Sequence, residues 1–239
     1  MAETKKTLVD CIRELEKVIE EHKREYDTTE EREDYWISEY TKQTQKPGLK
    51  SYELQEIKDR LKATQDEKAD ELEGIRNRYS EKVAKIRKEY DALLSEKFDV
   101  SPDAIDGAAL TMLDSGILSP GELYKLAETF AENPTMLRMI AKRAEDRMGT
   151  IDRERQREDF QRLYAVSLAG ENARNAKSNA LGNFDSVVKI SERLLGAERA
   201  SGFDKRSRES FSPILAHAIE NAVYYHDPSA TAEGAKETT

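Results

Sequence analysis

The chain has 239 residues, a formal net charge of −9, 36% charged residues and only 7% aromatic residues. With so few large apolar side chains, a core has to be built from narrow apolar stripes, which favours helical rods and small bundles over one large globule. The single cysteine, Cys11, excludes an intrachain disulfide and a cysteine-based zinc site. The negative charge argues against nucleic acid as a general partner, because phosphate affinity comes mainly from cationic side chains.

The first ten residues, MAETKKTLVD, lack an apolar signal core. No apolar run approaches the ~20 residues that a helix needs to cross a bilayer. We therefore expect a cytoplasmic protein without a membrane partner.

A first helix is predicted over residues 5–45. Its apolar side chains are spaced alternately by four and three residues, which is the heptad pattern of a coiled coil. This seam consists of Leu8, Ile12, Leu15, Ile19, His22 and Tyr26. Residues 27–34 are almost entirely polar and acidic, with Thr28 and Glu31 at capping-box spacing, so a break and restart of the helix there is an alternative. An apolar face resumes at Tyr35, Trp36, Ile37 and Tyr40.

A turn is predicted at residues 46–49, because Pro47 cannot continue a helix and Gly48 relaxes the backbone beside it. A long second helix, residues 51–97, should follow. Its apolar positions recur every seven residues at Leu72, Tyr79, Ile86 and Leu93.

The two seams allow two alternatives: they close on each other as an intrachain hairpin, or they join other copies of the chain. The second predicted helix is longer than the first, and the acidic stretch 27–34 matches a partner helix poorly. Both features favour self-association for the part that a hairpin would leave uncovered.

After this coiled-coil region, residues 1–98, we predict a small helical module at 99–148. Three places put a capping side chain before a proline, which is typical of helix starts: Ser101-Pro102, Ser119-Pro120 and Asn133-Pro134. A C-terminal helical region is predicted at 149–228, with its last helix starting at Ser212-Pro213, and a disordered tail at 229–239. The fold class is therefore all-α, with an N-terminal coiled-coil hairpin or rod followed by small helical modules.

The C-terminal region contains a basic segment, residues 172–208, with eight basic and four acidic side chains. An ordinary solvated surface and a docking surface for an acidic partner are both consistent with this pattern. The basic residues are Arg174, Lys177, Lys189, Arg193, Arg199, Lys205, Arg206 and Arg208.

Patterns that carry catalysis are missing from the sequence. The three histidines stand far apart, and there is no HExxH pair, glycine-rich phosphate loop or nucleophile elbow. No arrangement positions a nucleophile beside a base, so we expect no enzyme, no metal site and no cofactor.

The charged heptad front, the proline-capped helices and the short basic rear together resemble the head-assembly scaffolding proteins of tailed bacteriophages. Residues 110–143, LTMLDSGILSPGELYKLAETFAENPTMLRMIAKR, are similar to helical segments of phage structural proteins. The resemblance implies a homo-oligomer that acts in the host cytoplasm during capsid assembly and virion morphogenesis. Its coiled coil would self-associate, and its C-terminal helices would dock on a larger structural protein such as a coat protein. The alternative is a cytosolic coiled-coil adaptor or regulator that binds one specific protein.

Overall fold

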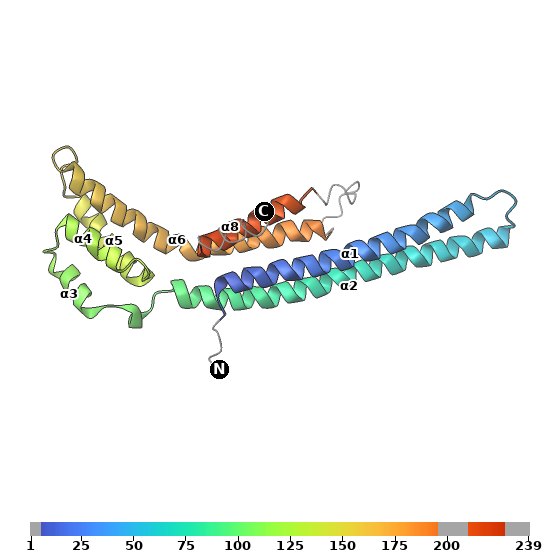
Figure 1. Ribbon diagram of the computed structural model, residues 1–239, viewed down its shortest axis with the longest axis horizontal. Coiled ribbons are helices and arrows are strands. Elements are labelled where there is room, and N and C mark those ends of the chain that lie inside the picture. Colours follow the sequence, from blue (N-terminus) through green and yellow to red (C-terminus); the bar gives the residue numbers. More distant parts are fainter. Residues whose placement is uncertain (1–5, 196–209, 228–239) are drawn as a thin grey trace, which may run out of the picture. The chain divides into compact units, whose positions relative to one another are not determined.

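The computed structural model describes residues 6–195 and 210–227 (Figure 1). Every regular element within these residues is a helix, which confirms the predicted all-α class. The helices divide between two compact units, one made from residues 1–90 and 183–239 and the other from residues 91–182. Two long helices, α2 (Ser51–Phe98) and α6 (Arg157–Leu194), contribute to both units.

The first unit is built on the predicted helical hairpin, which the structure confirms. Helix α1 (Leu8–Thr44) starts at a capping box between Thr7 and Asp10, and it runs antiparallel to α2 (Figure 1). Gly48 lies in the connecting turn with a φ of 86°, a conformation that favours glycine.

Helix α1 continues without a break through residues 27–34, so the alternative of a broken helix is wrong. The Thr28 hydroxyl does not cap a new helix but donates to the carbonyl oxygen of Arg24, 2.8 Å away within the same helix. Thr29 and Glu33 from this stretch are buried, so they continue the seam of the hairpin although they are polar.

Helix α8 (Ser212–His226) covers α1 in the part of the hairpin that we call the stem, residues 8–26 of α1 and 72–90 of α2. At the start of α8, the Lys23 Nζ lies 3.4 Å from the Ser212 Oγ. At its end, the His226 Nε2 lies 2.7 Å from the Tyr90 hydroxyl. The helix therefore extends along the stem and begins beside Lys23.

The last part of α6, residues 183–194, packs on the same stem against α2. The ring of Phe184 stacks on Tyr90 with 4.7 Å between ring centres, and the Ser191 hydroxyl bonds to the Tyr79 hydroxyl. Burial raises the pKa of Tyr79 to about 12. Four helical segments thus share the core of the stem.

The second unit joins the start of α6 and the last residues of α2 to a set of shorter helices. These are the 3₁₀ helix η1 (Pro102–Ala104), α3 (Gly107–Ser115), α4 (Pro120–Thr129) and α5 (Pro134–Met148). Ser119 and Asn133 cap α4 and α5 as predicted. Ser101-Pro102, in contrast, starts only η1, because Asp106 caps α3 by accepting a hydrogen bond from the Ala109 N–H.

Helices α5 and α6 approach each other closely at Gly170 of α6. A Cβ placed on Gly170 would lie 2.0 Å from the Cβ of Ala141 in α5. Helices α5 and α6 can approach this closely only because position 170 has no side chain.

The predicted boundaries at 98/99 and 148/149 differ from those of the compact units. The units change inside α2, after Tyr90, and inside α6, after Gly182. Packing of α6 and α8 on the stem decides this division, and contacts between segments so far apart in sequence leave no local pattern. The predicted tail at 229–239 lies outside the described residues.

Candidate interaction surface on the distal hairpin

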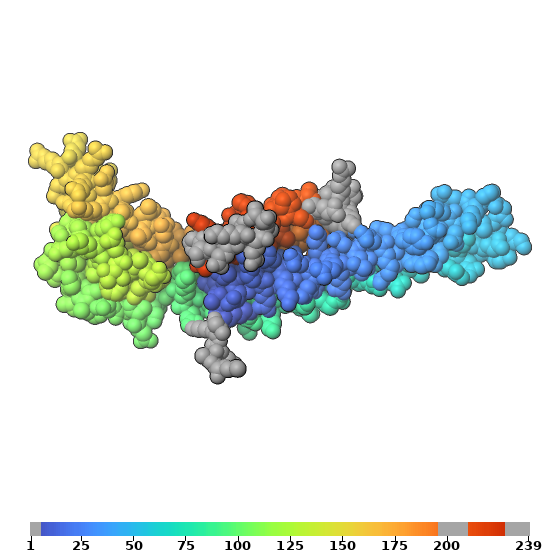
Figure 2. All heavy atoms as spheres, viewed as in Figure 1, coloured from blue at the N-terminus to red at the C-terminus, as the bar shows by residue number. Residues whose placement is uncertain are grey.

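Beyond the stem, no third helix of the described residues packs on the hairpin. We call this part the distal hairpin: residues 27–44 of α1, the turn, and residues 51–71 of α2. None of the α2 side chains from 51 to 71 is buried. Its apolar seam residues are only half-buried, namely Leu54, Ile57 and Leu61. Figure 2 shows this part in blue and cyan, with no other described segment against the face in view.

An aromatic cluster lies on α1 within the distal hairpin. Tyr35 is 59% exposed and Trp36, the only tryptophan of the sequence, is 47% exposed. The Trp36 ring is 5.2 Å from that of Tyr35 and stacks on Tyr40 at 6.2 Å, measured between ring centres. Tryptophan and tyrosine are the side chains that most often dominate the energy of protein interfaces.

This cluster continues a stripe that is buried in the stem. Trp36 and Tyr40 each lie five turns along α1 from Val18 and His22, at ~3.6 residues per turn, so all four point the same way. Val18 and His22 are 8% and 2% exposed. Along the stem the stripe is covered: the His22 ring lies edge-on against Tyr79 of α2, with 5.8 Å between ring centres, and α8 also packs on α1. Beyond the start of α8 beside Lys23, the stripe is exposed at Trp36.

Ion pairs connect the two helices of the distal hairpin. Arg32 pairs with Glu71, and the Lys68 Nζ lies 2.5 Å from an Asp34 carboxylate oxygen. Glu33 and Glu71 raise the pKa of Arg32, and Glu39 raises that of Lys42 in the same way. Such exposed pairs contribute little to stability, and they do not cover the apolar stripe.

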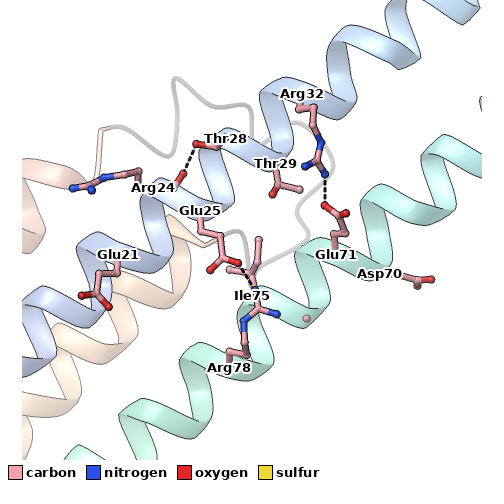
Figure 3. A pocket seen from close by; sticks show the side chains of 11 residues that line it. Glu21, Arg24, Glu25, Thr28, Thr29, Arg32, Asp70, Glu71, Ile75 and Arg78 are labelled. Atoms are coloured by element: carbon pink, nitrogen blue, oxygen red, sulfur yellow. Dashed lines mark hydrogen bonds and ion pairs between the residues drawn. The ribbon is translucent and has the colours of Figure 1, made fainter.

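A groove of about 840 Å³ lies where the stem meets the distal hairpin (Figure 3). Two ion pairs between α1 and α2 line it: Glu25 with Arg78, and Arg32 with Glu71. Glu25 and Arg32 lie within about 40° of Trp36 around the helix, at ~100° per residue, so the groove opens close to the side that carries the aromatic cluster. Within the described residues, no group of three or more His, Cys, Asp or Glu side chains could hold a metal ion.

Eight of the nine predicted coiled-coil residues are buried in the interior of the single chain. They are Leu8, Ile12, Leu15, Ile19, Tyr26, Leu72, Tyr79 and Ile86. The ninth, Leu93, is half-buried, and Leu94 is buried instead. A straight helix has 3.6 residues per turn, so a stripe drifts away from a strict seven-residue repeat. A second copy would have to use other residues.

The structure divides the predicted basic docking residues between the two units. Arg174 pairs with Glu145, and Lys177 with Asp99, all in the second unit. In the first unit, Lys189 is exposed and the Arg193 guanidinium lies 5.7 Å from the ring centre of Phe211. The remaining four, Arg199, Lys205, Arg206 and Arg208, lie outside the described residues.

The aromatic cluster was not among the residues that the sequence singled out as a site. Tyr35, Trp36 and Tyr40 indicated an apolar face, but the pattern did not show that this face stays exposed. The clustering of the only tryptophan with two tyrosines within six positions was the available signal.

Comparisons of the chain with protein-family models, with curated proteins and with solved structures return no match. Among the helices in the described residues, none is long and apolar enough to cross a membrane.

Proposed function

We propose that the protein is a non-enzymatic, self-associating assembly protein that joins copies of itself through the distal hairpin. The observation that carries this proposal is the apolar stripe of α1, which is buried at Val18 and His22 and exposed at Trp36. Helices in proteins gain most of their stability from packing of an apolar face. A second copy of the chain, packed on the distal hairpin, would bury this stripe in the way that α6 and α8 pack on the stem.

The narrower form of this proposal is a scaffolding protein of the kind that directs phage capsid assembly, with a coat protein as the larger partner. Its support is the resemblance of the sequence: an acidic chain, a charged heptad front, proline-capped helices and a basic rear. Such a protein would dock on its partner through C-terminal residues. Because Arg174 and Lys177 already hold acidic side chains of their own unit, the exposed Lys189 is the better docking candidate.

Sedimentation velocity of the full chain, over a wide concentration range at low and high salt, tests the proposal. We expect a monomer–dimer equilibrium that shifts towards the dimer as concentration rises and towards the monomer as salt rises, because salt screens the surface charges. A compact monomer at every concentration would contradict self-association in both its broad and its narrow form.

A second candidate is an adaptor that binds a single protein partner through the second unit. An apolar groove of about 380 Å³ favours it, lined by Val100, Ile105, Leu110, Leu113 and Met139 with charged side chains at its edge. Val100 is 61% exposed there, as a docking site for an apolar helix face requires. An adaptor predicts one defined stoichiometry that salt does not change, so the same sedimentation experiment separates the two functions.

A further inference from the structure

The charges of the distal hairpin are separated along its length. Next to the stem, residues 27–34 carry five acidic side chains and one basic side chain. Residues 66–73, the last two of which belong to the stem, carry the same numbers. Towards the turn, residues 41–62 carry six basic and three acidic side chains. Arg32 and Lys68, which bridge the two helices, are included in these numbers, so the separation remains after the pairs within the hairpin are counted.

This separation distinguishes the ways in which two hairpins can lie together. If two copies lay parallel, the acidic stretch of one copy would face the acidic stretch of the other, and the two basic turn regions would also face each other. If the copies overlap in opposite directions, each basic turn region lies against the acidic stretch of the other copy. Complementary charges select the second arrangement, because like charges held together cost free energy.

We propose that the distal hairpins of two copies overlap antiparallel to form a four-helix bundle, with a two-fold axis between Trp36 and Tyr40. The arrangement specifies how the self-association proposed above takes place, and it rests on that function. Each copy presents the same surface, as a two-fold interface requires. The aromatic clusters of both copies meet at the centre, where the energetically dominant residues of interfaces gather.

The groove of Figure 3 fits this arrangement. With the axis between Trp36 and Tyr40, the turn at 45–50 of one copy lies beside residues 26–31 of the other. At this level the groove is lined by Glu25, Thr28 and Arg32 of α1 and by the facing side of α2. It leaves about 840 Å³ for the turn of the second copy.

A charge exchange between two variants tests the direction of the overlap. Lys46→Glu/Lys58→Glu makes the turn region acidic, and Asp70→Lys/Glu73→Lys makes the stretch near the stem basic; all four side chains are exposed. We expect each variant alone to self-associate roughly tenfold more weakly at low salt. In a parallel overlap, where like charges already face each other, neither variant would weaken the association. An equimolar mixture should recover the association, because both contacts of the mixed pair are then complementary, and this recovery shows that the weakening comes from charge and not from misfolding. The matched control, Lys85→Glu/Lys88→Glu on the exposed side of the stem, should associate like the native chain.

Cross-linking tests the same geometry and removes only one charge, that of Lys46. Copies with Thr28→Cys are mixed with copies with Lys46→Cys and treated with a short bifunctional maleimide. Cys11 stays in place, since it is buried and burial raises the pKa of its thiol. The antiparallel overlap predicts a product that joins the two different variants, while two Thr28 positions lie roughly 30 Å apart at ~1.5 Å per residue.

Oligomers that join Thr28→Cys to itself, or variants that the mixture does not rescue, would overturn the antiparallel overlap and leave self-association standing. A native chain that stays monomeric would overturn both.

Discussion

Among the described glycines, Gly170 is the one at which an added methyl group would meet the closest neighbour. A Cβ at this position meets the Cβ of Ala141 at 2.0 Å and the carbonyl oxygen of Leu137 at 3.3 Å. Backbone and a short side chain cannot move aside, so α5 and α6 would have to separate. We expect Gly170→Ala to lower the free energy of unfolding by about 1–3 kcal/mol, the usual cost of overpacking, as measured by chemical denaturation.

Gly182, in the same helix, provides the matched control. Nothing lies within 4 Å of a Cβ placed there. Gly182→Ala should therefore raise the free energy of unfolding by roughly 0.5–1 kcal/mol through helix propensity alone. Equal effects of the two substitutions would show that the close approach at Gly170 is not what stabilises the second unit.

The residues that form turns and helix caps could be predicted from the sequence. Pro47 and Gly48 marked the turn, and Ser119 and Asn133 marked the starts of α4 and α5, because a cap or a turn depends on neighbours within a few positions. Ser101-Pro102 starts only the short 3₁₀ helix η1, and the next α-helix is capped by Asp106, which was not among the caps predicted from the sequence. The role of Gly170 was not predictable, since Ala141 approaches it from another helix.

The hairpin helices should differ in stability along their own length. Ile86 of the stem is 2% exposed, whereas Ile57 of the distal hairpin is half-buried. Ile86→Ala should cost about 2–5 kcal/mol of unfolding free energy, as is usual for a large-to-small change in a core. Ile57→Ala should cost the dilute chain less than about 1 kcal/mol, because the side chain already contacts water.

Denaturation of both variants in dilute solution measures this difference. Repeating it at concentrations where the native chain self-associates should increase the effect of Ile57→Ala and leave that of Ile86→Ala unchanged. A cost for Ile57→Ala as large as that for Ile86→Ala in the dilute chain would mean that the distal hairpin is packed as well as the stem.

The sequence predicted the two hairpin helices well, but it did not predict which other segments of the chain pack on them. Heptad spacing located both long helices and identified the apolar face that each presents to the other. It could not show along which length of the hairpin further segments pack, because these segments, residues 183–194 and α8, lie far along the chain. For the same reason, the sequence pattern does not distinguish the exposed Trp36 from the buried Val18, because both lie on the same face of α1.

For the whole molecule, the division into stem and distal hairpin predicts that self-association can be removed by a deletion that leaves folding intact. The Asp34–Lys68 pair marks two residues at the same level of the hairpin. Removing residues 35–67 and joining Asp34 to Lys68 through a short glycine-rich turn should preserve the thermal unfolding of the stem. The shortened chain should remain monomeric, because it lacks the aromatic cluster.

Calorimetry and sedimentation of the shortened chain, beside the full chain at equal concentrations, measure the two properties independently. Oligomers of the shortened chain would move the association surface to another part of the molecule. A stem that melts at a much lower temperature would instead show that it depends on the distal hairpin.

Trp36 is the only tryptophan in the sequence, and it lies half-exposed near the middle of the distal hairpin. The indole emission of the chain therefore comes from one place, the centre of the proposed overlap. Burial of this ring in a dry contact moves its emission to shorter wavelength, so the protein carries its own optical reporter. Assembly can be followed in real time without a label, and a second protein that lacks tryptophan can be added without obscuring the signal.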